Sequence, residues 1–331
     1  MPDDPVRIGL VGVGGIALTH LDAIQAVSTA RLAALVEPRE DVAAPISADL
    51  HVPLFASHRD PELLSLVDAV VICTPPNLHA EISEHFIVEG KHVLCEKPLA
   101  VERHQAGRMA ELAETHDRVL MMASKFRFVG DIIRAKEIIE SGVLGRVVSY
   151  ENSFSGKVDM AGRWNSRREI SGGGVIMDNG PHSVDIARYL FGPIERIHAL
   201  AAPPLQDIDV EDTARLQFLT QGGVFGVADL SWTMNKMSET YVRVYGTEGV
   251  LLVGWQGSRY RLAADSDWTP FGSGYLKVEA LSGQLRNFIE VIEGSATPHI
   301  TIDDALASVE AIEAANRSLR NNTWVPVGEE S

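Results

Sequence analysis

The segment from Val6 to Ala26 constrains the fold more than any other part of the chain. Val6 to Val11 form a short apolar run that leads into glycines at positions 12, 14 and 15, and Ile16 to Ala26 then has the apolar spacing of a helix. The side chains expected on its inner face are Leu18, Leu21 and Ile24. A strand that passes through a glycine turn into a helix is typical of a β-α-β unit, so the chain is expected to begin with a parallel sheet.

Other apolar, β-branched runs before residue 124 predict the remaining strands of this sheet. They are Leu32 to Val36, Ala69 to Cys73, His92 to Cys95 and Val119 to Ala123. Helices are expected between them around Leu63 to Leu66, His79 to Glu89 and Glu102 to Thr115. Strands and helices that alternate in this way predict an α/β domain with a doubly wound parallel sheet, of the Rossmann type, over residues 1–123.

The pattern changes after residue 123, where one helix over Val129 to Ser141 is followed by strands with little helix between them. The expected strands are Arg146 to Phe154, Glu195 to Ala201, Thr213 to Leu219, Val224 to Thr233, Tyr241 to Tyr245 and Val250 to Val253. Several alternate apolar and polar residues, which is typical of antiparallel strands with one solvated face. We therefore expect a second, α+β domain over residues 124–331, with an open, mainly antiparallel sheet and closing helices over Leu285 to Ile292 and Asp303 to Leu319.

Composition narrows the class of partner. The 331 residues include 45 acidic and 29 basic side chains, which gives a net charge of −16. Such a surface repels phosphate backbones and anionic lipids, so a small-molecule ligand is expected rather than nucleic acid or a membrane. Cys73 and Cys95 end apolar runs and are expected to be buried thiols, with neither a disulfide nor a metal site. The acidic N-terminus has no signal-peptide pattern, and no apolar run reaches ~20 residues, so the chain is expected to be cytoplasmic.

The glycine turn has the spacing of a dinucleotide-binding motif. Gly12, Gly14 and Ala17 match G-x-G-x-x-A, and Gly15 and Ile16 open a helix whose N-terminus can face a pyrophosphate. A simpler explanation is that these glycines only permit tight packing.

Residues at the end of the next expected strand, Leu32 to Val36, indicate whether NAD or NADP is bound. Glu37 lies 25 positions after Gly12, where an acid accepts hydrogen bonds from the adenosine ribose and favours NAD. Arg39 can instead pair with a 2′-phosphate, so NADP stays an alternative.

Three further motifs carry a resemblance to a known family. They are CTPPNLH at 73–79, CEKPLA at 95–100 and GGGVIMDNGPHSVD at 172–185, with Asp-x-x-x-His beginning 81 positions after the lysine of Glu-Lys-Pro. With these motifs the chain resembles, over nearly its whole length, the Gfo/Idh/MocA family of nicotinamide-dependent oxidoreductases. The resemblance implies a Rossmann domain joined to an antiparallel-sheet domain. It also implies oxidation or reduction of carbinols of cyclitols, aldoses or sugar nucleotides, in dimers or tetramers built through that sheet.

The resemblance also implies roles for individual residues. Lys97, Asp178 and His182 would be catalytic, and Glu96 would support the cofactor and the lysine. The nicotinamide side of the cofactor would be lined by Thr74, Pro75, Asn77 and His79. A histidine, with an ordinary pKa of ~6.5, suits transfer of the carbinol proton. Asp178 stands four residues before His182, so in a helix the two share a face. Lys97 can stabilise the carbinol oxygen or be the base itself.

The sequence motifs indicate the residues that contact the substrate less clearly than they indicate the catalytic residues. The candidates are Lys125, Arg127, Arg163, Trp164, Asn165, Arg167 and Arg168. A tryptophan can stack on a sugar ring and arginines can bind a phosphate or carboxylate, but the same loop suits an oligomer contact equally well. Asp185 is expected to face the pocket or to cap a helix, and Pro181 to kink or start one. Trp232, Met234 and Met237 are expected in the core or at an interface.

These observations favour an NAD(H)-dependent oxidoreductase that transfers hydride between nicotinamide and a secondary alcohol or ketone of a sugar or cyclitol. Two other functions stay open. One is an NAD-dependent glycosidase with a transient redox cycle, and the other is a nucleotide-binding regulator without catalysis. The presence of Lys97, Asp178 and His182 together argues against the regulator.

Overall fold

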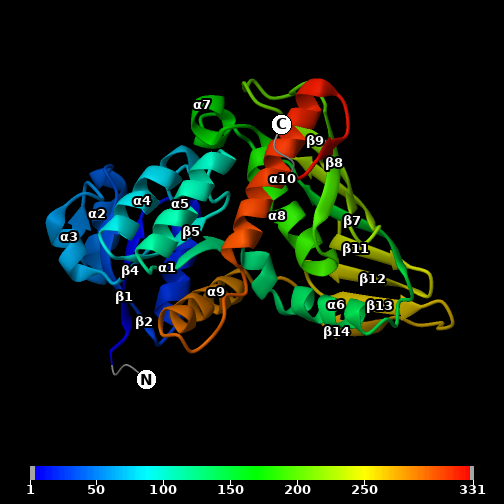
Figure 1. The fold of residues 1–331 in the computed structure, drawn as a ribbon, viewed down its shortest axis with the longest axis horizontal. Coiled ribbons are helices and arrows are strands. Elements are labelled where there is room, and N and C mark those ends of the chain that lie inside the picture. The colour runs from blue at the N-terminus through cyan, green and yellow to red at the C-terminus, as the bar shows by residue number, and fades with distance from the viewer. Residues whose placement is uncertain (1–3, 329–331) are drawn as a thin grey trace. The chain divides into compact units, whose positions relative to one another are not determined.

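A computed structural model of the chain describes residues 4–328, so the predicted domain limits at residues 1 and 331 lie outside the described residues (Figure 1). The chain divides into two compact units. Unit 1 comprises Met1–Lys125 and Lys277–Leu306, and unit 2 comprises Phe126–Leu276 and Ala307–Ser331. The sequence predicted two continuous domains, whereas the segment from Lys277 to Leu306 returns to unit 1. The reason is packing, because helix α9 (Lys277–Ile292) lies against helix α1 (Gly15–Ala26).

Unit 1 contains a six-stranded parallel sheet in the order β3-β2-β1-β4-β5-β6. The strands are β1 (Val6–Val11), β2 (Ala30–Val36), β3 (Leu54–Phe55), β4 (Ala69–Ile72), β5 (His92–Glu96) and β6 (Leu120–Ala123). The other helices are α2 (Glu40–Leu50), α3 (Pro61–Leu66), α4 (His79–Val88) and α5 (Arg103–Thr115). The predicted doubly wound sheet is confirmed, and β3 and α2 are additions to it. In this order, β1 and β4 are neighbours at the point where the strand order reverses, and ligands of such sheets bind there.

The inner face of α1 differs from the prediction. Ala17, His20 and Ile24 are buried, but Leu18 is 46% exposed, so the expectation that it points inward is wrong. His20 takes an inner position because its Nε2 donates a hydrogen bond to the buried carboxylate of Glu96 over 2.9 Å. A polar partner from β5 therefore decides which face of the helix is buried.

Unit 2 contains a nine-stranded sheet in the order β14-β13-β12-β11-β7-β10-β9-β8-β15. Its strands are β7 (Val147–Ser155), β8 (Ile194–Ala201), β9 (Thr213–Thr220), β10 (Phe225–Ser231), β11 (Thr240–Gly246), β12 (Gly249–Gly254), β13 (Ser258–Leu262), β14 (Thr269–Gly272) and β15 (Val325–Pro326). Its helices are α6 (Gly130–Glu140), α7 (Arg168–Ser171) and α8 (Val175–Phe191), and α10 (Ile302–Asn321) is shared with unit 1. Among the described strands of this sheet, only β7 and β10 pair in parallel, so the predicted mainly antiparallel sheet is confirmed.

One face of this sheet forms the core of unit 2. Helix α8 packs on β7, β9 and β10, and the strand residues that share its face, such as Tyr150, Leu216 and Ala228, are fully buried. Residues of the opposite face, such as Glu151 and Arg215, are partly or wholly exposed. The alternation read from the sequence therefore reflects one covered and one open face.

Helix α8 continues through Pro181, so of the two alternatives expected there, a kink or a helix start, the helix start is wrong. The helix begins six residues earlier, at Val175, and packing holds it together across the proline. A Cβ on the preceding Gly180 would lie 2.8 Å from Cδ1 of Ile312 in α10, so the two helices approach closely at this point. Tertiary contact thus outweighs the local cost of the proline.

Two further expectations concern thiols and membranes. Cys73 and Cys95 are both free and buried, as predicted, and burial raises the pKa of each thiol. Among residues 4–328, no helix is both long enough and apolar enough to span a bilayer.

A buried carboxylate fastens the first turn of α6 to the β13–β14 hairpin. Asp131, 4% exposed, accepts hydrogen bonds from the Ser258 hydroxyl and, over 2.9 Å, from the amide of Gly274. Gly272 lies directly against this carboxylate, and a Cβ there would overlap it. The glycine is therefore required by the close approach of Asp131.

We expect Gly272→Ala to destabilise the protein by about 1–3 kcal/mol, since the added methyl must displace the Asp131 carboxylate from its partners. Thermal unfolding followed by circular dichroism measures the change. Gly130→Ala is the matched control, because a Cβ at that neighbouring helical position meets nothing within 4 Å. An unchanged midpoint for Gly272→Ala would refute the clash.

Candidate active site

The glycine turn after β1 is shaped by contact with the end of β4. Gly12 has φ +84°, and a Cβ there would lie 3.0 Å from both the Cys73 carbonyl carbon and the Thr74 nitrogen. Any other residue would be strained and would clash with this backbone. By contrast, a Cβ on Gly14 or Gly15 would meet nothing within 4 Å. The turn is therefore tight on the side of the sheet and open on the other.

The open side lies at the N-terminus of α1. Within the described chain, no side chain caps this helix and its first turn has no acidic residue, so its positive end is not compensated there. The hydroxyl of Thr74 is buried and has no hydrogen-bond partner among the described residues. A buried hydroxyl without a partner calls for an explanation, and a bound ligand supplies one. The open glycines, the uncapped helix and this hydroxyl fit a dinucleotide.

Glu37 follows β2 and is 5% exposed. Its Oε2 accepts from the amide of Val13 over 3.0 Å, and its Oε1 accepts from Nε of Arg39 over 2.8 Å. Burial would raise the pKa of Glu37, but the hydrogen bonds from Arg39 and Val13 outweigh it and hold the pKa below its ordinary value. The two residues that the sequence assigned to alternative cofactors thus form one ion pair, in which the Arg39 side chain is 62% exposed.

Lys97 follows a second buried carboxylate, that of Glu96 at the end of β5. The Glu96 Oε1 accepts from His20 and its Oε2 accepts from the amide of Lys97 over 3.1 Å. Burial opposes ionisation, but His20, Lys125 and Lys97 together lower the pKa of Glu96 to about 2. An ionised Glu96 therefore links α1 to the residue that the sequence predicts to be catalytic.

The loop after Lys97 contacts the turn after β4 through His79. Its Nδ1 lies 2.8 Å from the Pro98 carbonyl oxygen and its Nε2 lies 2.9 Å from that of Thr74. Burial lowers the pKa of this 1% exposed ring. Pro75 is half-buried and Asn77 is exposed in the same turn. His79 thus supports the main chain of both loops.

Asp178 and His182 lie one turn apart in α8, as the sequence predicted, and share a face of that helix. Asp178 is half-buried and His182 is 8% exposed. The His182 ring stands edge-on to Phe126 and Phe154, with centroid distances of 5.1 and 6.1 Å. The imidazole is therefore packed between aromatic rings of unit 2.

Polar contacts anchor α8 to β7. The Ser183 hydroxyl donates to Oδ1 of Asn152 over 2.5 Å, and Nδ2 of Asn179 donates to the Phe154 carbonyl over 3.2 Å. These bonds flank His182 in the chain and fix the helix on the sheet.

Arg127 was predicted to contact substrate and Asp185 to face a pocket or cap a helix. In the structure they form a buried ion pair, in which Nη2 of Arg127 donates to Oδ1 of Asp185 over 2.7 Å. The Arg127 guanidinium also lies over the Tyr189 ring. A side chain 4% exposed and bound in this way stabilises α8 rather than presenting its charge to solvent.

The predicted substrate loop follows β7. Trp164 is 37% exposed, Asn165 is half-buried, and Arg163 and Arg167 are exposed. The amide of Arg168 donates to Oδ1 of Asp209 over 3.1 Å. The loop therefore offers an aromatic face and several cations to solvent within unit 2.

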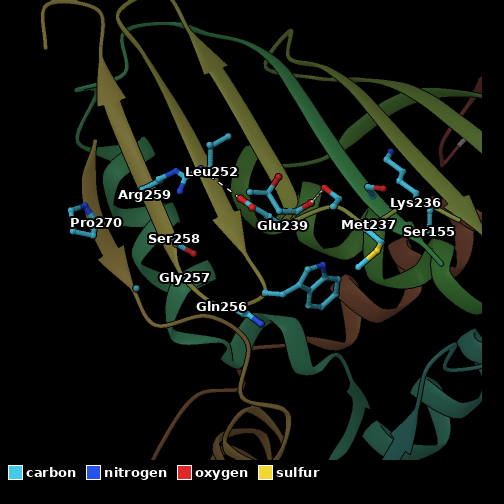
Figure 2. A pocket seen from close by; sticks show the side chains of 15 residues that line it. Ser155, Lys236, Met237, Glu239, Leu252, Gln256, Gly257, Ser258, Arg259 and Pro270 are labelled. Carbon is cyan, nitrogen blue, oxygen red and sulfur yellow. Dashed lines mark hydrogen bonds and ion pairs between the residues drawn. The ribbon is translucent and has the colours of Figure 1, made fainter. Parts of the chain in front are cut away.

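A hollow of about 660 Å³ lies at one end of the unit 2 sheet (Figure 2). The side chains that line it include Ser155, Lys236, Met237, Glu239, Trp255, Gln256 and Arg259. Trp255 also packs on Tyr241 and Phe154, and Phe154 contacts His182. Hydroxyl, amide and charged groups beside a tryptophan suit a polyhydroxylated ligand.

The sequence did not predict this hollow, since its lining comes from five strands and their loops. Of the three residues assigned to core or interface, Trp232 is buried, whereas Met234 is 41% exposed and Met237, in the hollow, is 97% exposed.

Comparison with known proteins identifies the family. A family model described as "Oxidoreductase family, NAD-binding Rossmann fold" matches residues 6–124, and the model of the GFO/IDH/MocA C-terminal domain matches residues 132–252. The chain is similar to myo-inositol 2-dehydrogenase of Thermotoga maritima, with 26% identity over 98% of this chain and 99% of that protein. It is also similar to the NADP-dependent D-xylose 1-dehydrogenase of Haloarcula marismortui, with 25% identity over 98% and 93%.

Among solved structures, the aldose-aldose oxidoreductase of Caulobacter crescentus, complexed with glycerol, has a TM-score of 0.88 and 25% identity, and the match covers 98% of this chain and 100% of that one. The two family models and these full-length similarities agree with the glycine turn, the Glu-Lys-Pro triplet and the Asp-x-x-x-His motif. The chain therefore belongs to the GFO/IDH/MocA family of NAD(P)-dependent oxidoreductases.

Proposed function

We propose that this enzyme transfers hydride between NAD(H) and a secondary alcohol or ketone of a sugar or cyclitol. The strongest support for this proposal is the arrangement of the glycine turn, Thr74 and Lys97 in unit 1. An open glycine turn and an unpartnered Thr74 hydroxyl lie at the edge of the sheet where β5 presents Lys97. The names of the relatives, which refer to xylose and inositol, support the substrate class.

The residues of unit 1 would hold the cofactor as follows. The amides of Gly14, Gly15 and Ile16 would face the pyrophosphate, and Thr74, Pro75 and Asn77 would line the nicotinamide side. Gly12 would shape the turn beneath the pyrophosphate, since its own amide donates to the Val36 carbonyl over 2.8 Å. When bound, the nicotinamide supplies the hydride acceptor or donor. His79 and Glu96 position Thr74 and Lys97, respectively, through the contacts described above.

Oxidation of an alcohol also requires removal of its hydroxyl proton. We assign that step to His182, with Asp178 on the same helix face stabilising the imidazolium that forms. Lys97 donates a hydrogen bond to the carbinol oxygen and stabilises the negative charge that develops on it.

For the substrate we propose contacts with Lys125, Trp164, Asn165 and Arg168. Arg127 acts indirectly, because its ion pair with Asp185 holds α8. We also propose a cytoplasmic homodimer or homotetramer. Sedimentation of the purified protein and fractionation of cells measure these two properties, and a monomer or a membrane-associated protein would refute them.

The overall function is tested by incubating the protein with NAD and a panel of aldoses, cyclitols and glycosides. The proposal requires NADH to accumulate together with an oxidised product. Glycoside cleavage without net NADH would instead establish the glycosidase cycle, and nucleotide binding without any turnover would establish a regulator. Either result would refute the dehydrogenase.

Separate roles for Lys97 and His182 predict different kinetic effects. Lys97→Ala should lower kcat roughly 10²- to 10³-fold, and His182→Ala should also remove one limb of the pH–rate profile. Neither change should alter the dissociation constant for NADH by more than about threefold. Lys91→Ala is the control, since it lies just before the opposite end of β5. Near-normal turnover without Lys97, or an unchanged limb without His182, would remove that residue from the mechanism.

The Glu37–Arg39 pair predicts how cofactor choice can be changed. Glu37→Ala releases Arg39 for a 2′-phosphate and removes the acceptor for the ribose, so NADH should bind about tenfold more weakly and NADPH more tightly. Arg39→Ala should have the opposite effect. Fluorescence titration with each cofactor measures both constants, with the exposed Arg31→Ala as control. Parallel changes for NADH and NADPH in both variants would contradict this role.

A further inference from the structure

Glu211 lies two residues before β9 and accepts hydrogen bonds from the start of α8. Its Oε1 accepts from the amides of Gly174 and Ile176 over 2.9 and 3.2 Å, and its carbonyl accepts from the amide of Val175 over 2.9 Å. Three successive amides at the N-terminus of the helix are therefore satisfied by one residue that lies 35 positions or more away in the chain. Sequence reasoning did not single out this residue.

No residue of the helix end can replace this cap. Gly174 is the N-cap position and has no side chain, and a Cβ there would overlap the main chain of Glu211. Burial raises the pKa of Glu211, and the amide bonds together with the charge of Arg168 oppose that rise. The positive end of α8 likewise favours a carboxylate at this point. The charge and the geometry of Glu211 thus both match the helix terminus.

The start of α8 determines where its functional side chains lie. The amide of Asp178 bonds back to the Gly174 carbonyl over 3.0 Å, and His182 follows one turn later. Because a helix behaves as a rigid element over two turns, displacement at Gly174 is transmitted to both side chains. A misplacement of about 1 Å in a catalytic group can lower a rate about 10²-fold.

We propose that Glu211 is a positioning residue that sets the place of Asp178 and His182 by fixing the first turn of α8. The kinetic part of this proposal rests on the function assigned to His182 above. In this proposal Glu211 does not act by contact with the side chains of Asp178 and His182. It acts through the backbone of α8.

Kinetics of three variants test the proposal. Glu211→Ala should lower kcat roughly 10- to 100-fold without changing the dissociation constant for NADH. Glu211→Gln should restore most of kcat, because its amide oxygen can accept the same two bonds. Asp212→Asn is the matched control. Asp212 is also buried in the same segment, but its carboxylate accepts from the amides of Leu205 and Gln206, over 2.8 and 3.1 Å, in a loop rather than a helix. It should lower stability without this pattern in kcat.

A double-mutant cycle with His182→Ala separates positioning from general destabilisation. If Glu211 acts through His182, adding Glu211→Ala to His182→Ala should change kcat by no more than about twofold. The full effect of Glu211→Ala persisting in that background would overturn the proposal. Should Glu211→Ala fail to fold, Glu211→Asp replaces it in each arm, because its shorter side chain withdraws the carboxylate from the amides.

The NMR signal of the His182 ring provides a readout that does not depend on activity. The ring lies edge-on to Phe126 and Phe154, so ring currents make its proton shifts sensitive to small displacements. The signal, identified by its loss in His182→Ala, should move in Glu211→Ala and stay in place in Glu211→Gln and Asp212→Asn. If the signal does not move in Glu211→Ala, the positioning role is overturned, whether or not the protein is a dehydrogenase. If the signal moves but the protein has no dehydrogenase activity, only the proposed function is refuted.

Discussion

The site in unit 1 depends on the hydrogen bonds that the buried carboxylate of Glu96 accepts. Removing an ionised carboxylate from water is costly, and the structure offsets that cost with His20, with the amide of Lys97 and with two nearby lysine charges. Because His20 belongs to α1 and Lys97 ends β5, one ionised group fixes the glycine-turn helix relative to the proposed catalytic lysine. The same requirement explains why a histidine, and not Leu18, lies on the inner face of α1.

In unit 2, buried polar groups with satisfied hydrogen bonds hold helix α8 in place in a similar way. A carboxylate caps its start, the Ser183 hydroxyl joins its middle to Asn152, and the ion pair of Arg127 and Asp185 holds it two residues further on. Each group is buried and satisfied, so each has one favourable geometry. The helix that carries Asp178 and His182 is consequently held at several points along its length, which is the rigidity that a proton-transfer group requires.

The sequence predicted most of unit 1 because the signals there are local: apolar runs form the strands, and glycines at fixed spacing form the turn. It did not predict α2, whose interior Pro45 is unfavourable to a helix, or β3, which has two residues. In the candidate site, the lysine, aspartate and histidine could be named from motifs. The buried role of Arg127 and the cap formed by Glu211 could not, because each depends on a partner more than 30 residues away in the chain.

The central claim is that the open side of the glycine turn receives a dinucleotide, and a titration of nicotinamide fluorescence with wild-type protein and Gly14→Val tests it directly. The valine side chain enters space in which the protein has no atom within 4 Å of the Cβ, so the fold should be unaffected while the ligand is excluded. We predict saturable binding of NADH to the wild type, tighter than that of NADPH, and its loss in the variant. Binding of neither cofactor to the wild type, or equal binding to the variant, would contradict the claim.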